Sequence, residues 1–334
     1  MNRNLVVNRA ERNYSEILSK LYNRYYKRFT RHSEVTSSFW RSVGWHKVEM
    51  RNGCWSAQGV GFGRYLPANV RRRVLFLPIR LQLFLLLKRL RCPSYLIDKG
   101  RRLANKGEFL FDYDFVRQVL SLHEILKQLG VKTLDDKHYP LSSQGIKVAC
   151  VIGDGYGYLS ALLRVVDSGI KVISVNLGRT LFFDVLYSQK YLPMQNTVLL
   201  RKEDNNKLEL LAKHNLVFCE AENYHILEGM PIDLFINIVS MQEMDPPVIE
   251  KYFDYITSST SSSVYFYCCN RLEKELPDGM VTRFMEYPWK DCIVLLDELC
   301  PWCQKCPLTK PPFWKPFDGP IQHRFVKWKA DENK

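Results

Sequence analysis

A short apolar run followed by three closely spaced glycines constrains the fold of this 334-residue chain more than any other feature. Val148–Ile152 is apolar throughout, which is typical of a strand buried on both faces of a parallel sheet. Gly153, Gly155 and Gly157 follow at alternate positions, and an apolar pattern with helical spacing begins at Leu159. Glycine permits positive φ and close approach to a ligand, and the N-terminus of a helix favours a negatively charged group. The stretch therefore predicts a strand, a ligand-binding turn and a helix; the alternative is a plain turn before a packing helix.

Candidate strands and helices alternate after this stretch. Apolar runs predict four further strands, and amphipathic or proline-initiated patterns predict helices between some of them. The predicted strands cover residues 171–176, 216–219, 232–239 and 263–268, and the predicted helices cover residues 181–191 and 247–256. This order predicts an α/β fold with a doubly wound, Rossmann-like sheet, in which ligands bind at the carboxyl ends of the strands.

The N-terminal part is predicted to be mainly helical. Residues 14–29 and 112–130 carry apolar side chains at helical spacing, and Gly130 is a signal for a helix end. The apolar run within residues 71–91 is too short for a transmembrane helix, so no transmembrane segment is predicted. This run predicts a buried helix, and a helix lying on a membrane surface is the alternative.

The chain divides into two parts of different charge. The proline- and serine-containing stretch 137–145 predicts a linker, so we expect an N-terminal region at residues 1–140 and a second domain at residues 141–334. Residues 1–145 hold 27 basic and 11 acidic side chains, a net charge of +16, whereas the rest of the chain has −3. This basicity predicts an anionic partner: nucleic acid, a membrane surface, or a phosphorylated or acidic substrate. A solvated basic face without a specific partner is the alternative.

Cysteine content and the first residues predict the compartment. Ten cysteines in a chain of this length lack the density of a disulfide scaffold and predict reduced thiols. The opening residues are polar and charged, so no secretory signal is predicted. We therefore expect a cytoplasmic protein, with attachment to the periphery of a membrane as a further option.

Two motifs carry a resemblance to known families. The Gly-x-Gly-x-Gly spacing resembles the first motif of class I methyltransferases that use S-adenosyl-L-methionine (SAM). Ser240–Met244 after the fourth strand, with Asn270-Arg271 on the fifth, resembles the bacterial putative sugar O-methyltransferase family over roughly residues 110–330. This resemblance implies SAM as cofactor, a sugar or glycan hydroxyl as acceptor, and an antiparallel last strand, for which residues 322–328 are suited.

The resemblance and the positions of the strand ends together give a set of site residues. Glu243 is the first candidate for a general base and His323 the second, because an alcohol nucleophile gains from a base. Alternatives are a carboxylate that binds loop amides and an exposed strand histidine. The substrate-binding candidates are Gln242, Asn270 and Arg271. The cofactor-binding candidates are Gly153, Asp154, Gly155, Tyr156, Gly157, Asn176, Leu177, Glu220, Ala221, Glu222, Ser240 and Met241.

Two positions depart from the pattern of the family. Family members often carry acids at the positions held here by Val151 and Asn176. An amide can still bind a ribose hydroxyl with less charge assistance, so Asn176→Asp is predicted to keep or improve SAM affinity. Asp154 and Glu222 are expected to take over from the missing acids, and loss of activity is the alternative.

Two further motifs are given simpler interpretations. Asp245-Pro246-Pro247-Val248 resembles the Asp-Pro-Pro-Tyr signature of DNA amino-methyltransferases, but the aromatic is missing and proline suits a helix start. Cys300, Cys303 and Cys306 have metal-ligand spacing but lack a fourth ligand, for which Cys292 is a candidate. Free thiols are expected, and no metal.

The sequence therefore predicts a SAM-dependent O-methyltransferase that acts on a sugar or sugar-containing metabolite. The basic N-terminal region is expected to form part of the acceptor side. Two alternatives remain: a nucleic-acid methyltransferase, and a non-catalytic binding protein that retains the methyltransferase fold.

Overall fold

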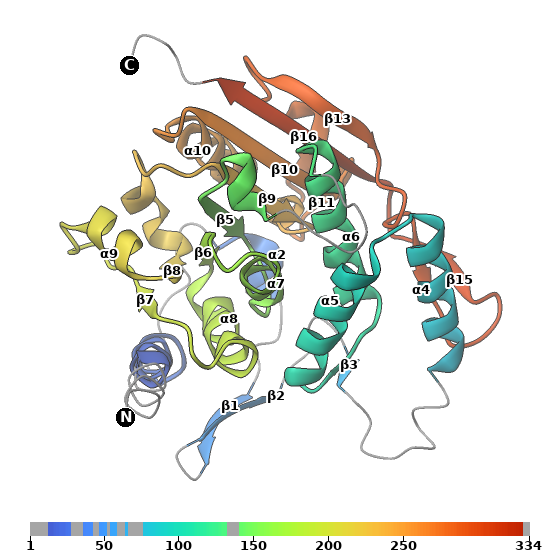
Figure 1. Ribbon diagram of the computed structural model, residues 1–334, viewed down its shortest axis with the longest axis horizontal. Coiled ribbons are helices and arrows are strands. Elements are labelled where there is room, and N and C mark those ends of the chain that lie inside the picture. The colour runs from blue at the N-terminus through green and yellow to red at the C-terminus, as the bar shows by residue number, and fades with distance from the viewer. Residues whose placement is uncertain are drawn as a thin grey trace.

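The computed structural model has one eight-stranded sheet with helices on both faces (Figure 1). The structure describes residues 13–27, 36–42, 47–51, 54–58, 64–65, 76–131 and 140–329. From one edge to the other the strands are β13 (Ile293–Leu299), β16 (Ile321–Lys329), β10 (Ser263–Arg271), β9 (Leu234–Ile238), β5 (Val148–Ile152), β6 (Lys171–Asn176), β8 (Leu216–Glu220) and β7 (Thr197–Leu199).

The strand order confirms the predicted fold class. The six strands from β10 to β7 are parallel to one another, whereas β16 is antiparallel to both of its neighbours. The predicted strand at residues 322–328 is therefore the antiparallel strand that the resemblance implied. The chain leaves β5 in one direction to β6 and returns on its other side as β9, so the topological switch point lies at the end of β5.

Helices cover the sheet because its central strands are apolar on both faces. In β5, Ala149 and Val151 face one hydrophobic cluster, whereas Val148, Cys150 and Ile152 face the other. The first cluster is covered by α5 (Ser94–Lys106), α6 (Tyr113–Gln128), α7 (Tyr158–Val166) and α8 (Gly178–Tyr191). The second is covered by α9 (Lys207–Lys213), η3 (Ala221–Leu227) and α10 (Pro246–Thr257).

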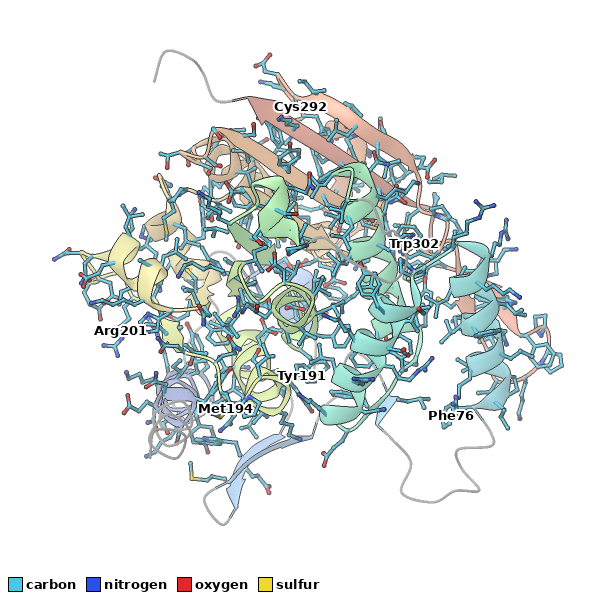
Figure 2. All side chains as sticks on the ribbon, in the orientation of Figure 1. Phe76, Tyr191, Met194, Arg201, Cys292 and Trp302 are labelled. Atoms are coloured by element: carbon cyan, nitrogen blue, oxygen red, sulfur yellow. The ribbon has the colours of Figure 1, made fainter. Side chains whose placement is uncertain are left out.

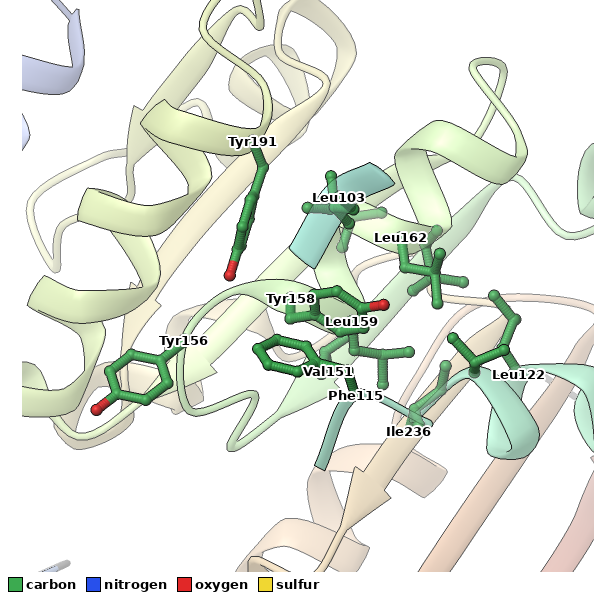
Figure 3. Close-up of a cluster of buried hydrophobic side chains, with 14 of the residues drawn as sticks. Leu103, Phe115, Leu122, Val151, Tyr156, Tyr158, Leu159, Leu162, Tyr191 and Ile236 are labelled. Atoms are coloured by element: carbon green, nitrogen blue, oxygen red, sulfur yellow. The ribbon is translucent and has the colours of Figure 1, made fainter. Parts of the chain in front are cut away.

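Helix α6 carries the N-terminal region onto the sheet. Asp112 caps its first turn by accepting a hydrogen bond from the Asp114 backbone at 3.3 Å, and Gly130 beyond its last turn has φ of 71°. Figure 3 shows Phe115 and Leu122 of this helix among the side chains of the first cluster. Residues before and after position 140 thus share one hydrophobic core, and their predicted division into two domains stays a prediction.

The first described residues also dock on the sheet domain. Residues 13–22 are helical and continue into η1 (Asn23–Lys27), and Tyr14, Leu18 and Leu21 are buried. This confirms docking for the described part of the predicted helix at 14–29; residues 28–29 lie outside the described residues. The remaining N-terminal elements are α2 (Ser38–Ser42), β1 (Lys47–Arg51), β2 (Cys54–Gln58), β3 (Arg64–Tyr65), α4 (Leu77–Arg89) and β4 (Phe109–Leu110).

Helix α4 does not fit the predicted buried helix at residues 71–91. Ile79, Leu83 and Leu87 are buried, but Leu81 and Phe84 on the outer side are 59% and 58% exposed. Helix α4 lies at the periphery (Figure 1), so only its inner side has a partner among the described residues. The prediction of burial is therefore wrong for half of this helix, and residues 71–75 lie outside the described part. No helix among the described residues is long and apolar enough to span a bilayer.

Several elements near the carboxyl terminus were not predicted. The edge strand β13 is exposed on both faces, so its apolar residues do not alternate in the way that marks a half-buried strand. Shorter elements follow β10 in this part: β11 (Glu273–Glu275), β12 (Val281–Arg283), η5 (Phe284–Glu286), β14 (Lys305–Pro307) and β15 (Trp314–Pro316). Another short element, η2 (Leu141–Gln144), precedes β5 earlier in the chain.

Candidate active site

Two adjoining cavities lie at the carboxyl ends of β5, β6 and β9, which is the topological switch point of the sheet. Each encloses about 20 Å³. Trp40, Gly153, Asn176, Ser240 and Glu243 line both cavities. Asp154 and Gly155 complete the first on the glycine-turn side, and Leu177 and Ala221 line the second. The structure therefore brings eight of the predicted site residues to one place.

The glycine turn has the conformation that its sequence predicts. Gly153 and Gly155 have φ of 76° and 85°, a region that side chains with a β-carbon rarely adopt. A β-carbon on Gly153 would lie 2.0 Å from Oγ of Ser240, so the turn also depends on close approach to the end of β9. Glycine is required at this position for both reasons.

Asp154 uses its carboxylate to begin helix α7. Its two oxygens accept hydrogen bonds from the backbone nitrogens of Leu159 at 2.9 Å and Ser160 at 2.7 Å. Burial raises the pKa of Asp154 against these hydrogen bonds. The side chain therefore holds the turn in place, and its expected role as a substitute cofactor acid stays a prediction.

Five of the cofactor-binding candidates do not line the cavities, and three of them lie in or beside the core around the glycine turn. The ring of Tyr156 packs against Phe109, Phe183 and Tyr187, and Figure 3 shows it pointing away from Val151. Met241 is fully buried, and Gly157 donates its backbone N–H to Asp184 at 3.2 Å. None of these three residues lines the cavities, so their expected contact with the cofactor stays a prediction.

Asn176 lines both cavities but is held in an internal network. Its Nδ2 donates to Asp184 at 2.9 Å, and its Oδ1 accepts from the backbone of Leu177 at 3.0 Å. Ser174 also donates to the Asp184 carboxylate, at 3.2 Å. Burial and the neighbouring Asp154 raise the pKa of Asp184 well above its ordinary value. Asp184 was missed because an isolated acid in a predicted helix resembles a solvated surface residue.

The acid that ends β8, Glu220, and the acid two residues later, Glu222, contact the N-terminal helix. Arg24 forms an ion pair with Glu220 at 2.7 Å, and the Tyr25 hydroxyl donates to Glu222 at 3.3 Å. Neither acid lines the two cavities. The ring of Tyr25 also lies where a β-carbon on Gly178 would be, at 2.1 Å. The N-terminal helix thus covers this side of the site.

A second N-terminal segment closes the site at the end of β9. Trp40 of α2 lines both cavities, and the Ser37 hydroxyl donates to the backbone oxygen of Glu243. Sequence reasoning expected the N-terminal region on the acceptor side but did not identify Trp40.

Glu243 is the acidic side chain best placed for proton transfer among the predicted candidates. It ends η4 (Met241–Glu243), directly after β9, and its side chain is 13% exposed. Burial raises the pKa of Glu243 to about 7, although Lys274 at 3.5 Å opposes the shift. Burial lowers the pKa of Lys274 in turn. A carboxyl with a pKa near neutrality can accept a proton at physiological pH.

Unpartnered polar atoms face the same place from two helices. Nε of Arg117 and Oε1 of Gln118 on α6, and Oγ1 of Thr180 on α8, are buried without a hydrogen-bond partner among the described residues. All three residues line the first cavity. Buried polar atoms are normally paired, so these atoms are suited to a polar ligand. Polar residues on the buried side of a predicted helix were the signal that could have identified them.

The backbone immediately before Ser240 is strained. Val239 has φ of 59°, which is an outlier for a β-branched residue, and its backbone N–H donates to Cys269 at 2.7 Å. Such strain costs on the order of 1–3 kcal/mol and collects at functional sites.

The predicted substrate-binding residues form internal contacts instead. The Gln242 backbone donates to Oδ1 of Asn270 at 3.1 Å, and the Arg271 backbone donates to Oε1 of Gln242 at 2.9 Å. The guanidinium of Arg271 pairs with Asp318 at 3.0 Å. None of the three lines the cavities, so their contribution is to hold η4 against β10 and thereby position Glu243.

His323 is not brought to the cavities. It lies on β16 with a fully buried side chain, and its Nδ1 is 3.0 Å from the Tyr267 hydroxyl. Its Nε2 is 3.4 Å from Glu298. The alternative of an exposed strand histidine is therefore wrong, and the position of His323 outside both cavities does not suit a second base beside Glu243.

Comparisons with known proteins found solved structures that match this chain at low identity. No protein-family model and no curated protein matched the sequence. A putative RNA methyltransferase of Pyrococcus horikoshii has 14% identity and a TM-score of 0.40, covering 72% of this chain and 100% of that chain. Magnesium protoporphyrin IX methyltransferase of Synechocystis with bound S-adenosylhomocysteine has 12% identity and a TM-score of 0.38, covering 71% and 95%. Mitomycin 7-O-methyltransferase has 12% identity and a TM-score of 0.36, covering 78% and 76%.

Likeness at this level does not establish an activity. The fold assignment rests on the strand order of this chain, with an antiparallel strand inserted near one edge of a parallel sheet.

Proposed function

We propose that the protein transfers a methyl group from SAM to a hydroxyl of a sugar or sugar-containing metabolite. The observation that carries the proposal is that the glycine turn after β5 and the buried carboxyl of Glu243 after β9 line the same cavity. One supplies a backbone that a cofactor can approach closely, and the other supplies a base of suitable pKa.

The residues present fit a cofactor that is both cationic and rich in polar atoms. Gly153 leaves no room for a side chain where the backbone faces Ser240 at the end of β9, and Gly155 has a positive φ that suits glycine. Oε1 of Gln118 and Oγ1 of Thr180, which have no hydrogen-bond partner among the described residues, lie in the wall of the first cavity and can bind a polar ligand. Asn176 keeps one N–H of its amide for a hydroxyl group, because Asp184 occupies only one. SAM would supply an electrophilic methyl group on a sulfonium when bound here.

The chain's own part in the reaction is to orient the acceptor and to take its proton. With an acceptor bound in the cavity, the carboxylate of Glu243 would take the proton of the acceptor hydroxyl. The Lys274 ammonium at 3.5 Å keeps part of the Glu243 population ionised at neutral pH, since its charge favours the carboxylate. Trp40 lines both cavities, where its ring would help to keep water from the reacting groups.

The choice of a sugar acceptor rests on the sequence resemblance at Ser240–Met244 and Asn270-Arg271. The basic N-terminal region favours an acceptor that carries phosphate, such as a nucleotide sugar. The same charge favours a nucleic-acid acceptor as a second candidate, and binding of nucleic acid should then fall steeply with salt.

Titration calorimetry with SAM and S-adenosylhomocysteine is the first test, followed by transfer of a labelled methyl group to nucleotide sugars, glycans and RNA. Glu243→Gln should lower the transfer rate by roughly 10²–10⁴ with SAM affinity little changed, because only proton acceptance is lost. The matched control is Glu250→Gln, which alters an exposed carboxylate on α10 and should leave the rate unchanged. Absence of any SAM binding would instead identify a binding protein that has kept the fold.

A further inference from the structure

Three buried cysteines from two separate segments meet beside β10 and β16. Cys269 lies on β10, whereas Cys300 and Cys303 lie in the turn that follows β13. Their Sγ atoms all lie within 4.8 Å of one another, and each residue is 0% exposed. Thiolates are the preferred ligands of Zn²⁺ and other soft cations.

The turn that carries two of these thiols is fixed by its backbone. The Cys300 N–H donates to the Ile321 carbonyl on β16 at 2.9 Å, and the Cys303 N–H donates to the Cys300 carbonyl at 3.1 Å. Gln304 also donates its side-chain amide to the Cys300 carbonyl, at 2.9 Å. The thiols are therefore held together by hydrogen bonds that do not involve sulfur.

We propose that Cys269, Cys300 and Cys303 bind one thiophilic divalent cation of the Zn²⁺ class, with His323 as the fourth ligand. Binding would replace the three thiol protons, which pass to solvent, by three metal–sulfur bonds. Four protein ligands and full burial are typical of a structural zinc site.

His323 lies beside the set in the strand register, although its ring nitrogens are not within 4.8 Å of all three Sγ atoms, so the ring must turn to complete the site. It is the direct partner of Cys269 in the β10–β16 ladder, and opposite residues have β-carbons about 4.5–5.5 Å apart. Nε2 of His323 lies 3.4 Å from Glu298, and a carboxylate on the outer nitrogen is the usual support of a metal-binding histidine. Its Nδ1 would have to leave the Tyr267 hydroxyl, which lies 3.0 Å away, and turn toward the three thiols.

The charge of the surroundings is compatible with this set. A dication with three thiolates carries one negative charge, and the Arg117 guanidinium lies within electrostatic range of Cys269 and Cys303. The buried guanidinium of Arg117 needs a nearby negative charge, and its ion pair with Asp114 is long, at 3.5 Å. The net negative charge of the metal–thiolate complex would therefore offset the charge of this buried arginine, which also lines the first cavity.

The proposed ligands differ from the linear motif in the sequence. Cys306 lies on β14, is only partly buried and does not belong to the group. Cys292 lies well apart from Trp302, the neighbour of Cys303, in Figure 2. The third thiol comes instead from β10, which sequence spacing alone did not indicate.

Metal content of the full chain tests the proposal. Protein purified after expression with added Zn²⁺ should hold one zinc per chain by mass spectrometry, and replacement by Co²⁺ should give sulfur-to-cobalt charge-transfer absorption. Cys303→Ser and Cys269→Ser should lose the ion, whereas the matched control Cys306→Ser should retain it. His323→Gln should weaken Co²⁺ binding at least tenfold, in line with the loss of one ligand.

A second measurement keeps the test valid if a ligand variant fails to fold. A chelator should lower the Tm of the wild-type protein and of Cys306→Ser. A wild-type protein with no stoichiometric zinc and no response to chelator would overturn the proposal, and so would a folded Cys303→Ser that retains the ion. Loss of zinc from Cys306→Ser, or unchanged Co²⁺ binding by His323→Gln, would overturn this ligand set.

Discussion

Replacement of Glu243 by glutamine is expected to change how stability depends on pH. Burial raises the pKa of Glu243 from its usual 4.5 to about 7 in the folded protein. In the unfolded chain the carboxyl regains its ordinary pKa, so between these two values the folded state holds a proton that the unfolded state releases. The stabilising contribution of protonated Glu243 is therefore complete below pH 4.5 and is lost as pH rises through 7.

The magnitude follows from the size of the pKa shift. One pKa unit corresponds to about 1.4 kcal/mol, so the whole shift is worth about 3 kcal/mol, of which about 2.5 kcal/mol falls between pH 5 and pH 8. Glutamine does not titrate, so the free energy of unfolding of the wild type minus that of Glu243→Gln should fall by this amount over the same range.

Urea unfolding at several pH values between 5 and 8 measures this difference. Glu250→Gln is the control, because its exposed carboxyl should leave the pH profile of the wild type unchanged. Parallel profiles for the wild type and Glu243→Gln would show that the carboxyl of Glu243 is not buried in the folded protein. The reasoning about its pKa, and with it the choice of Glu243 as base, would then be refuted.

Three further substitutions test the site. Gly155→Val should abolish SAM binding in calorimetry, because a β-branched residue resists φ of 85°; a folded variant that binds normally would contradict the role of the turn. Val239→Gly should be more stable to urea than Val239→Ala by about 1 kcal/mol, because only glycine relieves φ of 59°; equal midpoints would show that this backbone is not strained. Asn176→Asp should lower Tm more at pH 8 than at pH 5, since it places a second carboxylate beside Asp184. Improved SAM affinity with unchanged Tm would favour the opposite expectation from sequence.

The central sheet could be predicted because each strand is short, apolar and bounded by turn residues. The run at Val148–Ile152 has the predicted limits in the structure, and the run at 171–176 coincides with β6. Helix α6 was equally clear from its apolar spacing and from Gly130. Helix α4 was misjudged because hydrophobic content does not reveal whether a second layer covers a helix.

The candidate site could be predicted only where its residues follow strands directly. Gly153, Ser240 and Glu243 meet because parallel strands end at one edge of a sheet. Trp40 and Arg117 were not predicted, since they reach the site through tertiary packing of distant segments. The same limit explains the cysteines: spacing indicated Cys306, whereas strand register brings Cys269 to the cluster.

The contacts of the N-terminal segments with the site affect how fast a ligand can enter and leave. The ion pair of Arg24 with Glu220 and the hydrogen bond from Ser37 to Glu243 connect two described N-terminal segments, residues 13–27 and 36–42, to opposite sides of the site. With both segments in place the two cavities enclose only about 20 Å³ each, so we expect these segments to move when a ligand the size of a nucleoside enters or leaves. Their movement is then expected to limit how fast ligands exchange, and exchange should quicken when Arg24 is replaced by alanine.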